Sequence, residues 1–284
     1  MTAADRLRIA AVQTEVTTDP TANGRAVRHA LRQAAADGAR LAHLCEGALS
    51  GYAGQAKPHF DGWHIDWTPV HDELNAVAEL AGELGMWVVI GGNHRLTGER
   101  RPHNSLWIIN DRGELVDRYD KRFCSHTEIT RFYTPGTVPC TFEVDSFRFG
   151  CLLCIEVNFP ELWLEQAALG IDCVLFSTFS EDPIFDILAR GHAAANGFWV
   201  SVAVPARHGD AMPSGVIGPH GYRLASAPTE RRPAVVWADL DRTDPDLDVA
   251  LHKARPWRRL ARSGAPYQGR HADDDPRSHD RHSY

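Results

Sequence analysis

Short apolar runs alternate along the chain with longer segments in which apolar residues recur every three or four positions. The short runs predict buried strands, and the wider spacing predicts amphipathic helices. The predicted strands cover residues 8–13, 39–44, 86–90, 104–109, 114–119, 141–144, 147–153, 172–177, 199–204, 214–217, 222–225 and 234–240. The predicted helices cover residues 22–37, 68–84, 161–169 and 183–196. A further helical pattern over 246–262 contains Pro256 and is expected to be broken there.

The order of these elements predicts an α/β fold. Single helices separate pairs of strands, which favours two sheets with helices outside them over one doubly wound sheet. The sequence shows neither an internal repeat nor a domain linker, so residues 1–269 are expected to form a single domain. Residues 270–284 are rich in Asp, His, Arg and Ser and are expected to be a disordered tail.

Composition and charge narrow the classes of function. The 284 residues are 43% hydrophobic, and the formal net charge of −7 argues against nucleic acid or an anionic membrane as the main partner. No apolar run approaches the roughly 18 residues that a membrane span needs. The first residues lack an apolar signal core, so a cytoplasmic location is expected. The six cysteines are therefore not expected to form a disulfide framework.

Four residues with reactive side chains stand at or near the ends of predicted strands. Glu46, Lys121 and Cys154 each follow a strand, and Glu128 lies in the loop after Lys121. Open α/β folds place ligands at the carboxyl ends of strands, so these side chains are expected to converge in one pocket. Each of these residues could instead have no catalytic role, because cysteines are often packed in cores and charged residues are usually solvated at the surface. Cys154 also precedes a helix start, which is expected to favour a thiolate.

A glutamate, a lysine and a cysteine suffice for attack on an amide carbonyl or a nitrile carbon. The carboxylate takes the thiol proton as the sulfur attacks. The ammonium and the N–H of Ile155, the residue after the nucleophile, stabilise the oxyanion. A Cys-His hydrolase would need a histidine base, and none of the 15 histidines has an equally persuasive strand-end position. His59, His64 and His71 match no metal-ligand spacing, so no metal is expected.

These residues carry a resemblance to the nitrilase, or carbon–nitrogen hydrolase, superfamily that extends from about Arg8 to about Arg262. The chain resembles, in order, the family's opening strand at 8–13, "PE…L(T/S)GY" at 45–52, "Y-x-K" at 119–122, "E…F-x-PG" at 128–136 and "C-x-(D/E)-x-x-(F/Y)-P-E" at 154–161. A sixth segment at 189–197 resembles "RA-x-EN" poorly, since Ala195 stands where Glu is usual. The five better matches in the right order make the resemblance specific.

The resemblance implies a four-layer α-β-β-α sandwich, no metal or cofactor, and a thioester intermediate formed on a small-molecule amide substrate. Carried over to this sequence, it makes Cys154 the nucleophile, Glu46 the general base, Lys121 the catalytic lysine and Glu128 a second, supporting glutamate. It also implies a homodimer or higher homo-oligomer, with helices near the nucleophile and the C-terminal arm in the interface.

Departures from the family pattern bear on the substrate. Asn158 stands where many amidase-type members carry arginine, which weighs against carbamoyl amino acids as substrates. Ile155 departs from the Cys-Trp-Glu-Asn of nitrilases, so an amide is favoured over a nitrile. Glu156 replaces the common Asp, and Phe179 follows a predicted strand in a loop that is expected to line the pocket. These four residues are the candidates for binding the oxyanion or the substrate.

The favoured function is hydrolysis of a non-peptide carbon–nitrogen bond, of amide or carbamoyl type. Nitrile hydrolysis or acyl transfer would use the same three residues and stays open. A catalytically silent binding protein on this fold is the third alternative, and the retained Glu46, Lys121 and Cys154 argue against it.

Overall fold

Two six-stranded sheets form the centre of the molecule. The computed structural model describes residues 5–55, 61 and 64–282. The first sheet has the order β12-β1-β2-β3-β4-β5, from β1 (Arg6–Gln13), β2 (Leu41–Leu44), β3 (Trp87–His94), β4 (His103–Ile109), β5 (Leu115–Asp120) and β12 (Ala234–Asp241). The second has the order β11-β10-β9-β8-β7-β6, from β6 (Thr141–Val144), β7 (Phe147–Leu153), β8 (Cys173–Ser177), β9 (Trp199–Ala203), β10 (Gly215–Ile217) and β11 (Arg223–Ser226).

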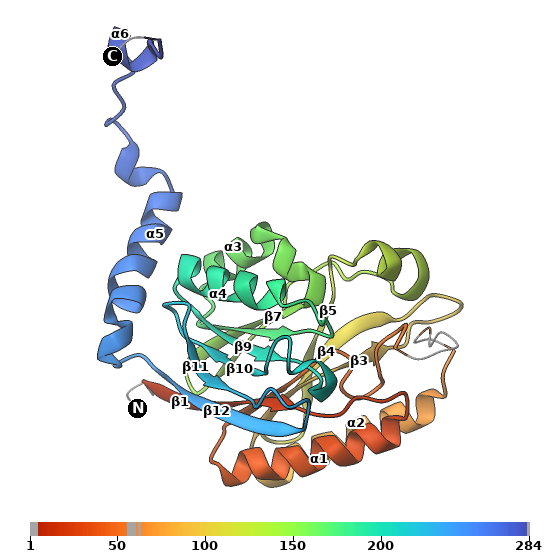
Figure 1. Ribbon diagram of the computed structural model, residues 1–284. Coiled ribbons are helices and arrows are strands. Elements are labelled where there is room, and N and C mark those ends of the chain that lie inside the picture. The colour runs from red at the N-terminus through yellow and green to blue at the C-terminus, as the bar shows by residue number, and fades with distance from the viewer. Residues whose placement is uncertain (1–4, 56–60, 62–63, 283–284) are drawn as a thin grey trace.

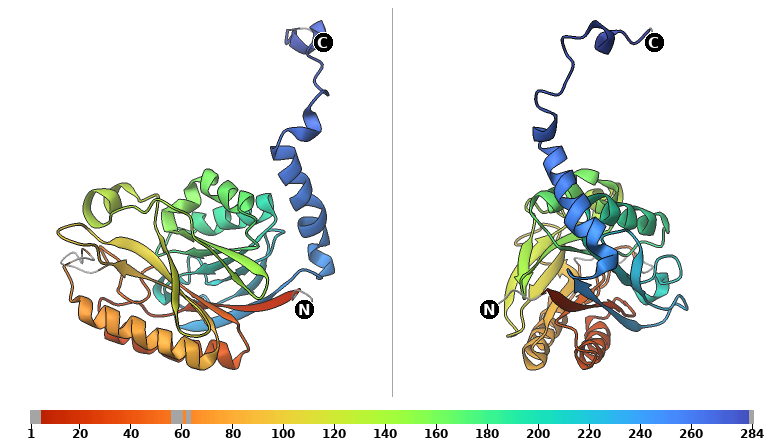
Figure 2. Two further views of the ribbon diagram at one scale, coloured as in Figure 1. Left: turned by 180° about the vertical axis from the view of Figure 1, so that it is seen from behind. Right: turned by 90° about the vertical axis from the view of Figure 1, so that its left-hand side faces the viewer.

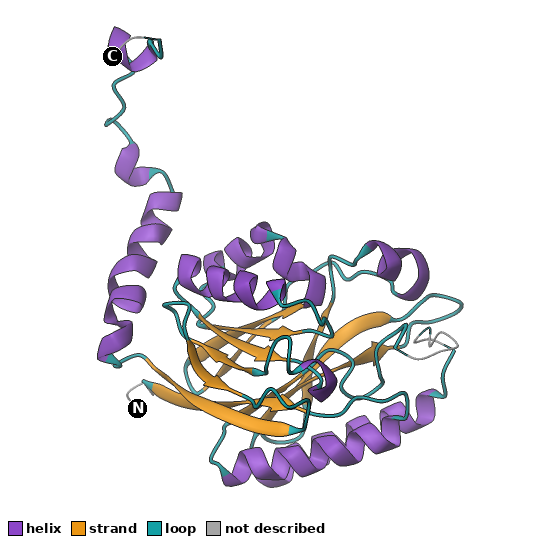
Figure 3. Cartoon of the chain, viewed as in Figure 1, coloured by secondary structure: helices purple, strands orange, loops and turns teal. Residues whose placement is uncertain are grey.

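Helices cover the outer face of each sheet, so the layers run helix, sheet, sheet, helix (Figures 1 and 3). α1 (Pro20–Ala36) and α2 (Trp67–Leu84) pack against the first sheet. α3 (Pro160–Ala168) and α4 (Ile184–Asn196) pack against the second. This arrangement confirms the expected α/β fold of α-β-β-α type.

Both faces of the central strands are buried. In β1, Ile9 packs into the core between the sheets, whereas Ala10 and Val12 pack under α1 and α2. Successive side chains of a strand point to opposite faces, so a strand between two apolar layers needs apolar residues at every position. This is why the strands stand out in the sequence as unbroken apolar runs.

The two sheets are built in the same order. Each has three parallel strands joined by helices and then two antiparallel strands: β1-α1-β2-α2-β3-β4-β5 in the first and β7-α3-β8-α4-β9-β10-β11 in the second. The sequence shows no repeat, so the correspondence is one of topology. Two antiparallel pairings after β3 make β5 run in the same direction as β2, and both strands therefore end at one edge of the sheet.

Several predicted boundaries differ from the observed ones, and two of the differences have clear local reasons. β3 continues past residue 90 to His94, because Gly91 is a point of close packing and not a stop. A Cβ at Gly91 would lie 2.2 Å from the carbonyl oxygen of Cys45. α2 begins at Trp67, one residue before its predicted start at residue 68, with Asp66 as its N-cap. The Asp66 carboxylate accepts the N–H of Thr68, as an aspartate at this position commonly does.

The segment that was expected to break at Pro256 is a continuous helix. Wide π-turns over Val249–Ala254 lead directly into α5 (Arg255–Arg262), and Pro256 lies in the first turn of α5. A proline has no N–H to donate, and the wide turn before it leaves room for its ring without ending the helix. α5 and the chain after it project away from the sheets (Figures 1 and 2).

The end of the chain makes little contact with the sandwich. Residues 267–282 are all exposed, and their regular structure includes the one-turn helix α6 (Pro276–His279). Disorder of the tail and a domain boundary at residue 269 stay predictions. In the part of the chain that the structure describes, no helix combines the length and apolar character that crossing a membrane requires.

Candidate active site

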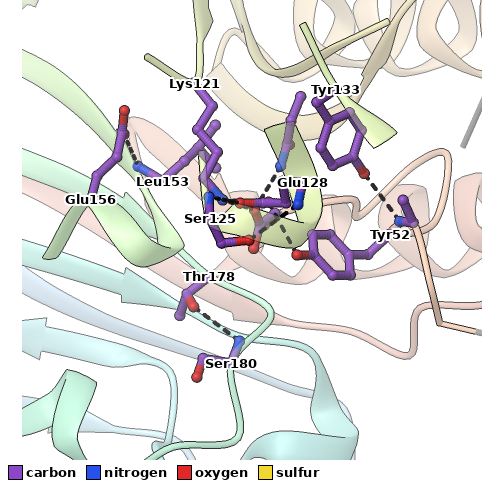
Figure 4. Close-up of polar contacts among 12 residues, drawn as sticks. Tyr52, Lys121, Ser125, Glu128, Tyr133, Leu153, Glu156, Thr178 and Ser180 are labelled. Atoms are coloured by element: carbon purple, nitrogen blue, oxygen red, sulfur yellow. Dashed lines mark hydrogen bonds and ion pairs between the residues drawn. The ribbon is translucent and has the colours of Figure 1, made fainter. Parts of the chain in front are cut away.

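Three charged side chains meet inside the molecule at the edge where β2 and β5 end. Glu46 lies two residues after β2, Lys121 directly follows β5, and Glu128 lies in the next loop. The ammonium of Lys121 is 3.0 Å from Oε1 of Glu46 and 2.6 Å from Oε1 of Glu128. All three side chains are buried, and the close-up in Figure 4 shows Lys121 pointing at Glu128. The structure thus brings together three of the four residues that were predicted to converge.

Neutral donors hold the two carboxylates. Asn104 Nδ2 donates to Oε1 of Glu46 at 2.7 Å. The hydroxyl of Tyr52 donates to Oε1 of Glu128 at 3.1 Å, and the N–H of Ser125 donates to its Oε2 at 2.7 Å (Figure 4). Oε2 of Glu46 is buried and accepts no hydrogen bond from the described residues. Glu46 therefore keeps one oxygen available to take a proton.

Cys154 directly follows β7 and has a strained backbone. Its φ is +49°, in the left-handed region that residues other than glycine rarely adopt. The chain turns there from β7 into a 3₁₀ helix, Cys154–Asn158, and then into α3. Such strain persists where the surroundings hold it, and it is frequent at functional sites. The residue as a whole is buried, with 9% of its surface exposed.

The thiol of Cys154 is protonated at neutral pH. Its pKa is raised to about 12, chiefly by burial and then by the charge of Glu46, while Lys121 acts in the opposite direction. These effects place Cys154 near the charged cluster. The helix start was expected to favour the thiolate, and burial disfavours the charged form more strongly than this effect and the charge of Lys121 favour it. Attack by this sulfur therefore needs a base that removes the proton.

The two glutamates have different proton affinities. Burial raises the pKa of Glu46 in spite of the opposing charge of Lys121. Burial also acts to raise the pKa of Glu128, but Lys121 and Ser125 together hold it below its ordinary value. For Lys121, burial acts to lower the pKa, and the two carboxylates raise it well above the ordinary value. Glu128 therefore balances a charged lysine, and Glu46 is the group suited to exchange a proton.

Three of the four candidate binding residues have distinct surroundings. Phe179 is buried, and its ring stacks on Tyr52 with 4.8 Å between centroids. Because the Tyr52 hydroxyl reaches Glu128, this pair forms one wall of the site. Ile155 directly follows Cys154 and packs partly against the core. Asn158 is exposed at the end of the 3₁₀ turn, and its role stays a prediction.

The prediction that Glu156 binds substrate was wrong. The side chain is fully buried, and both carboxylate oxygens are engaged by donors of the protein itself. A carboxylate occupied in this way inside the molecule has no oxygen left to hold a substrate.

Three side chains at the site were missed in the sequence. Thr178 follows β8 and lies beside Cys154, where its side chain acts to lower the pKa of the thiol. Its strand-end position was the signal that could have found it. Asn104 lies within a strand pattern that gives no such signal, and Tyr52 ends the 45–52 segment. Within the described ranges, no three His, Cys, Asp or Glu side chains are grouped to hold a metal ion, and His59 lies outside those ranges.

The sandwich and its site define the class of protein: a four-layer α/β fold with a lysine between two glutamates and a cysteine on a strained strand end. Residues 8–245 match the family model described as "Carbon-nitrogen hydrolase". The chain therefore belongs to the carbon–nitrogen hydrolase family, the nitrilase superfamily, which confirms the resemblance seen in the sequence.

Individual relatives are similar to the chain over most of their length. An omega-amidase from Pongo abelii is 26% identical over 251 residues, which cover 82% of this chain and 88% of that protein. A hydrolase from Mycobacterium tuberculosis is 28% identical over 263 residues, which cover 83% and 89%. The crystal structure of an amidase from Nesterenkonia sp. superimposes with a TM-score of 0.73 at 24% identity, covering 91% of this chain and 96% of that one. The chain is thus a nitrilase-superfamily hydrolase similar to amidases.

Proposed function

We propose that the protein hydrolyses the amide carbon–nitrogen bond of a small molecule through a thioester on Cys154. The observation that carries the proposal is the buried Glu46–Lys121–Glu128 cluster beside the protonated thiol. The names of the relatives support an amide substrate. One solved structure, a mutant of the amidase from Nesterenkonia sp. AN1, shows covalent addition of the acetamide moiety of fluoroacetamide at its active-site cysteine; it is 22% identical, with a TM-score of 0.73 over 90% of this chain and 96% of that chain.

Acylation begins with two coupled transfers. Oε2 of Glu46 takes the thiol proton while the sulfur of Cys154 forms a bond to the carbonyl carbon. The carbonyl electrons move to the oxygen, which receives hydrogen bonds from Lys121 and from the N–H of Ile155. An ammonium has three N–H donors, and Glu46 and Glu128 engage two of them, so one is left for the oxyanion. The carbon–nitrogen bond then breaks, and Glu46 gives its proton to the leaving amine or ammonia.

Deacylation uses the same groups with water as the nucleophile. Glu46 removes a proton from water as the oxygen attacks the thioester carbon, and the carbon–sulfur bond then breaks. The sulfur recovers its proton from Glu46, and the acid product leaves. Glu46 transfers protons in both half-reactions, which requires a pKa closer to neutrality than that of an exposed glutamate, and burial raises its pKa in this direction.

An ammonia-release assay over small amides, carbamoyl compounds and nitriles tests this proposal. The wild-type protein is expected to release ammonia from an amide, and intact-protein mass spectrometry should show an acyl group on Cys154. Cys154→Ala should abolish both signals while the protein stays folded. Cys173→Ala, which removes another buried thiol, is the matched control and should keep both.

Other outcomes would replace the proposal. A folded Cys154→Ala variant with wild-type turnover would exclude the thioester. Ammonia from nitriles alone would indicate nitrile hydrolysis, and acyl transfer to an added amine in preference to water would indicate a transferase. If no acyl adduct forms and Cys154 reacts with an alkylating agent as slowly as the other cysteines, the protein is a silent binding protein.

We also propose that copies of the chain associate. Large apolar side chains remain exposed on three neighbouring elements of the second sheet's side: Leu164 of α3 is 45% exposed, Ile187 of α4 is 61% exposed and Trp257 of α5 is 54% exposed. α5 also projects away from the sandwich (Figure 2). Apolar surface of this kind is typical of an interface between subunits.

A further inference from the structure

The carboxylate of Glu156 connects two segments that carry the reacting groups. Oε2 accepts the N–H of Leu153 at 2.7 Å, and Figure 4 shows Glu156 pointing back toward that residue. Oε1 accepts the N–H groups of Arg122 and Phe123 at 2.8 Å and 3.0 Å. The hydroxyl of Tyr119 lies 2.8 Å from both oxygens. We call this set of contacts the Glu156 bridge.

Each end of the Glu156 bridge adjoins a reactive side chain. Leu153 immediately precedes Cys154, whose positive φ needs support from its surroundings. Tyr119 and Arg122 lie on either side of Lys121 in the chain, so the other end holds the backbone that presents the ammonium. Cys154 follows β7 of the second sheet, and Lys121 follows β5 of the first sheet. The Glu156 bridge therefore fixes the position of Cys154 relative to that of Lys121.

A carboxylate is the group that this position requires. It accepts hydrogen bonds at both oxygens and donates none, which matches three backbone N–H groups and a hydroxyl. A glutamine of the same size would turn an NH₂ group toward one set of these donors. The length of the side chain also matters. One oxygen of Glu156 accepts the N–H of Leu153 at the start of its own 3₁₀ helix, as in a capping box. The other oxygen extends far enough to accept the N–H groups of Arg122 and Phe123, which follow Lys121.

We propose that Glu156 is a positioning residue that fixes the separation between the sulfur of Cys154 and the ammonium of Lys121. This inference deepens the proposed function, on which it rests for its kinetic readout. It assigns Glu156 a role in aligning the reacting groups, beyond support of the fold.

The reactivity of the Cys154 thiol reports this alignment directly. The charged groups that act on it are Glu46 and Glu128, which disfavour the thiolate, and Lys121, which favours it. If Lys121 moves away, the thiol pKa rises. The thiolate fraction at a fixed pH then falls, and the rate of alkylation at that pH falls with it. General loosening of the fold would lower the melting temperature and, by exposing the buried thiol, would raise this rate.

The experiment compares Glu156→Gln and Glu156→Asp with a matched control, Glu165→Gln. Glu165 forms an ion pair with the guanidinium of Arg122, so the control perturbs the same segment and leaves the Glu156 bridge intact. Alkylation of Cys154 by iodoacetamide is followed at neutral pH by peptide mass spectrometry, which separates it from the other cysteines. Melting temperature, kcat and KM for an amide are measured in parallel.

For Glu156→Gln we expect the rate of Cys154 alkylation at neutral pH to fall about tenfold, which is the effect of a rise of about one unit in the thiol pKa. The value of kcat should fall by a similar or larger factor while KM changes by less than about threefold. Glu156→Asp, which keeps the charge but is one methylene shorter, should recover part of the loss. Glu165→Gln should match the wild type in alkylation rate, kcat and KM, and lower only the melting temperature through the lost ion pair with Arg122.

An unchanged alkylation rate and kcat in folded Glu156→Gln, with only a lower melting temperature, would overturn the inference. If that variant does not fold, Tyr119→Phe removes one donor of the bridge and keeps the three backbone contacts. It should show a smaller fall in the alkylation rate, and an unchanged rate would again overturn the inference. If the wild type hydrolyses no amide but the alkylation rate still falls in Glu156→Gln, the proposed function fails and the positioning role stands.

Discussion

At the scale of single residues, His43 shows how one buried polar side chain is kept neutral. It lies between the sheets, with Nε2 2.7 Å from the hydroxyl of Ser177 and Nδ1 2.9 Å from the hydroxyl of Ser201. Ser177 donates its hydrogen to the carbonyl of Leu44, so it must accept from Nε2–H. Nδ1 is then the acceptor for Ser201. In the neutral form, these two hydroxyls satisfy both ring nitrogens.

This residue makes folding stability depend on pH. Burial lowers the pKa of His43 from 6.5 to about 3. In the unfolded chain the residue takes a proton near its ordinary pKa, whereas in the folded protein it takes one only near pH 3. The stabilisation is therefore complete above about pH 6.5 and is lost as the pH falls toward 3, at about 1.4 kcal/mol for each pH unit.

The measurement is the free energy of unfolding in urea at several pH values between 7.5 and 4.5. His43→Gln keeps a donor and an acceptor but does not titrate, so its stability relative to the wild type is expected to rise as the pH falls. A difference between the two proteins that is the same at every pH would contradict this account.

The roles of single residues could be predicted where a local sequence pattern marks their position, and not where their contacts are distant in the sequence. Glu46, Lys121 and Cys154 lie just after strands, and strand ends can be recognised from the apolar pattern. Glu156 was misassigned because three of its four partner residues lie more than thirty residues away, in the segment from Tyr119 to Phe123. Contacts of that kind depend on how the sheets stack, and no local pattern encodes them.

At the scale of elements, Gly91 in β3 allows close packing against the segment that carries Glu46, the proposed general base. A Cβ at this position would lie 2.2 Å from the carbonyl oxygen of Cys45 and 2.9 Å from Cα of Glu46. Both are backbone atoms, so they cannot turn away as a flexible side chain would. Any larger residue at Gly91 must displace Glu46.

Gly91→Ala is therefore expected to lower kcat/KM by about tenfold to a hundredfold, since a shift near 1 Å in a reacting group has effects of this size. The free energy of unfolding should fall by about 1–3 kcal/mol. Gly191→Ala is the matched control, because Gly191 lies within α4 with no neighbouring atom within 4 Å of a new Cβ. The control should keep full activity and gain about 0.5–1 kcal/mol of stability. Equal kcat/KM in the two variants would contradict the argument.

Helices and strands could be predicted where burial requires a recognisable pattern of apolar residues. β7 matches its predicted bounds, because both of its faces are buried. β3 was predicted too short, because Gly91 has the same appearance in a sequence whether it ends a strand or lets another segment approach. The continuous helix through Pro256 was missed for a related reason: π-turns have no sequence pattern that marks them.

At the scale of the whole molecule, the exposed apolar side chains of α3 and α4 predict an assembly. We expect light scattering after size exclusion to give at least twice the chain mass of 31.5 kDa. A double variant, Leu164→Asp with Ile187→Asp, should shift the protein to the monomer, because it buries two charges in the interface. Leu115→Asp, at an exposed position on β5 of the first sheet, is the control and should leave the mass unchanged.

A monomeric wild-type protein at micromolar concentration would contradict the assembly. A monomer caused by Leu115→Asp would instead place the interface on the first sheet.

The matching order of the two sheets has a further consequence for when the chain becomes active. Glu46, Lys121 and Glu128 all precede β6, whereas Cys154 and Thr178 follow it. During synthesis, the first half emerges while it still lacks the proposed nucleophile, and its sheet is completed only when β12, near the end of the chain, pairs with β1. We therefore expect the proposed activity only once the second half has been made and has docked. A gene cut between β5 and β6 would give a first fragment without the nucleophile and without the strand that completes its sheet, and we expect neither fragment alone to hydrolyse an amide.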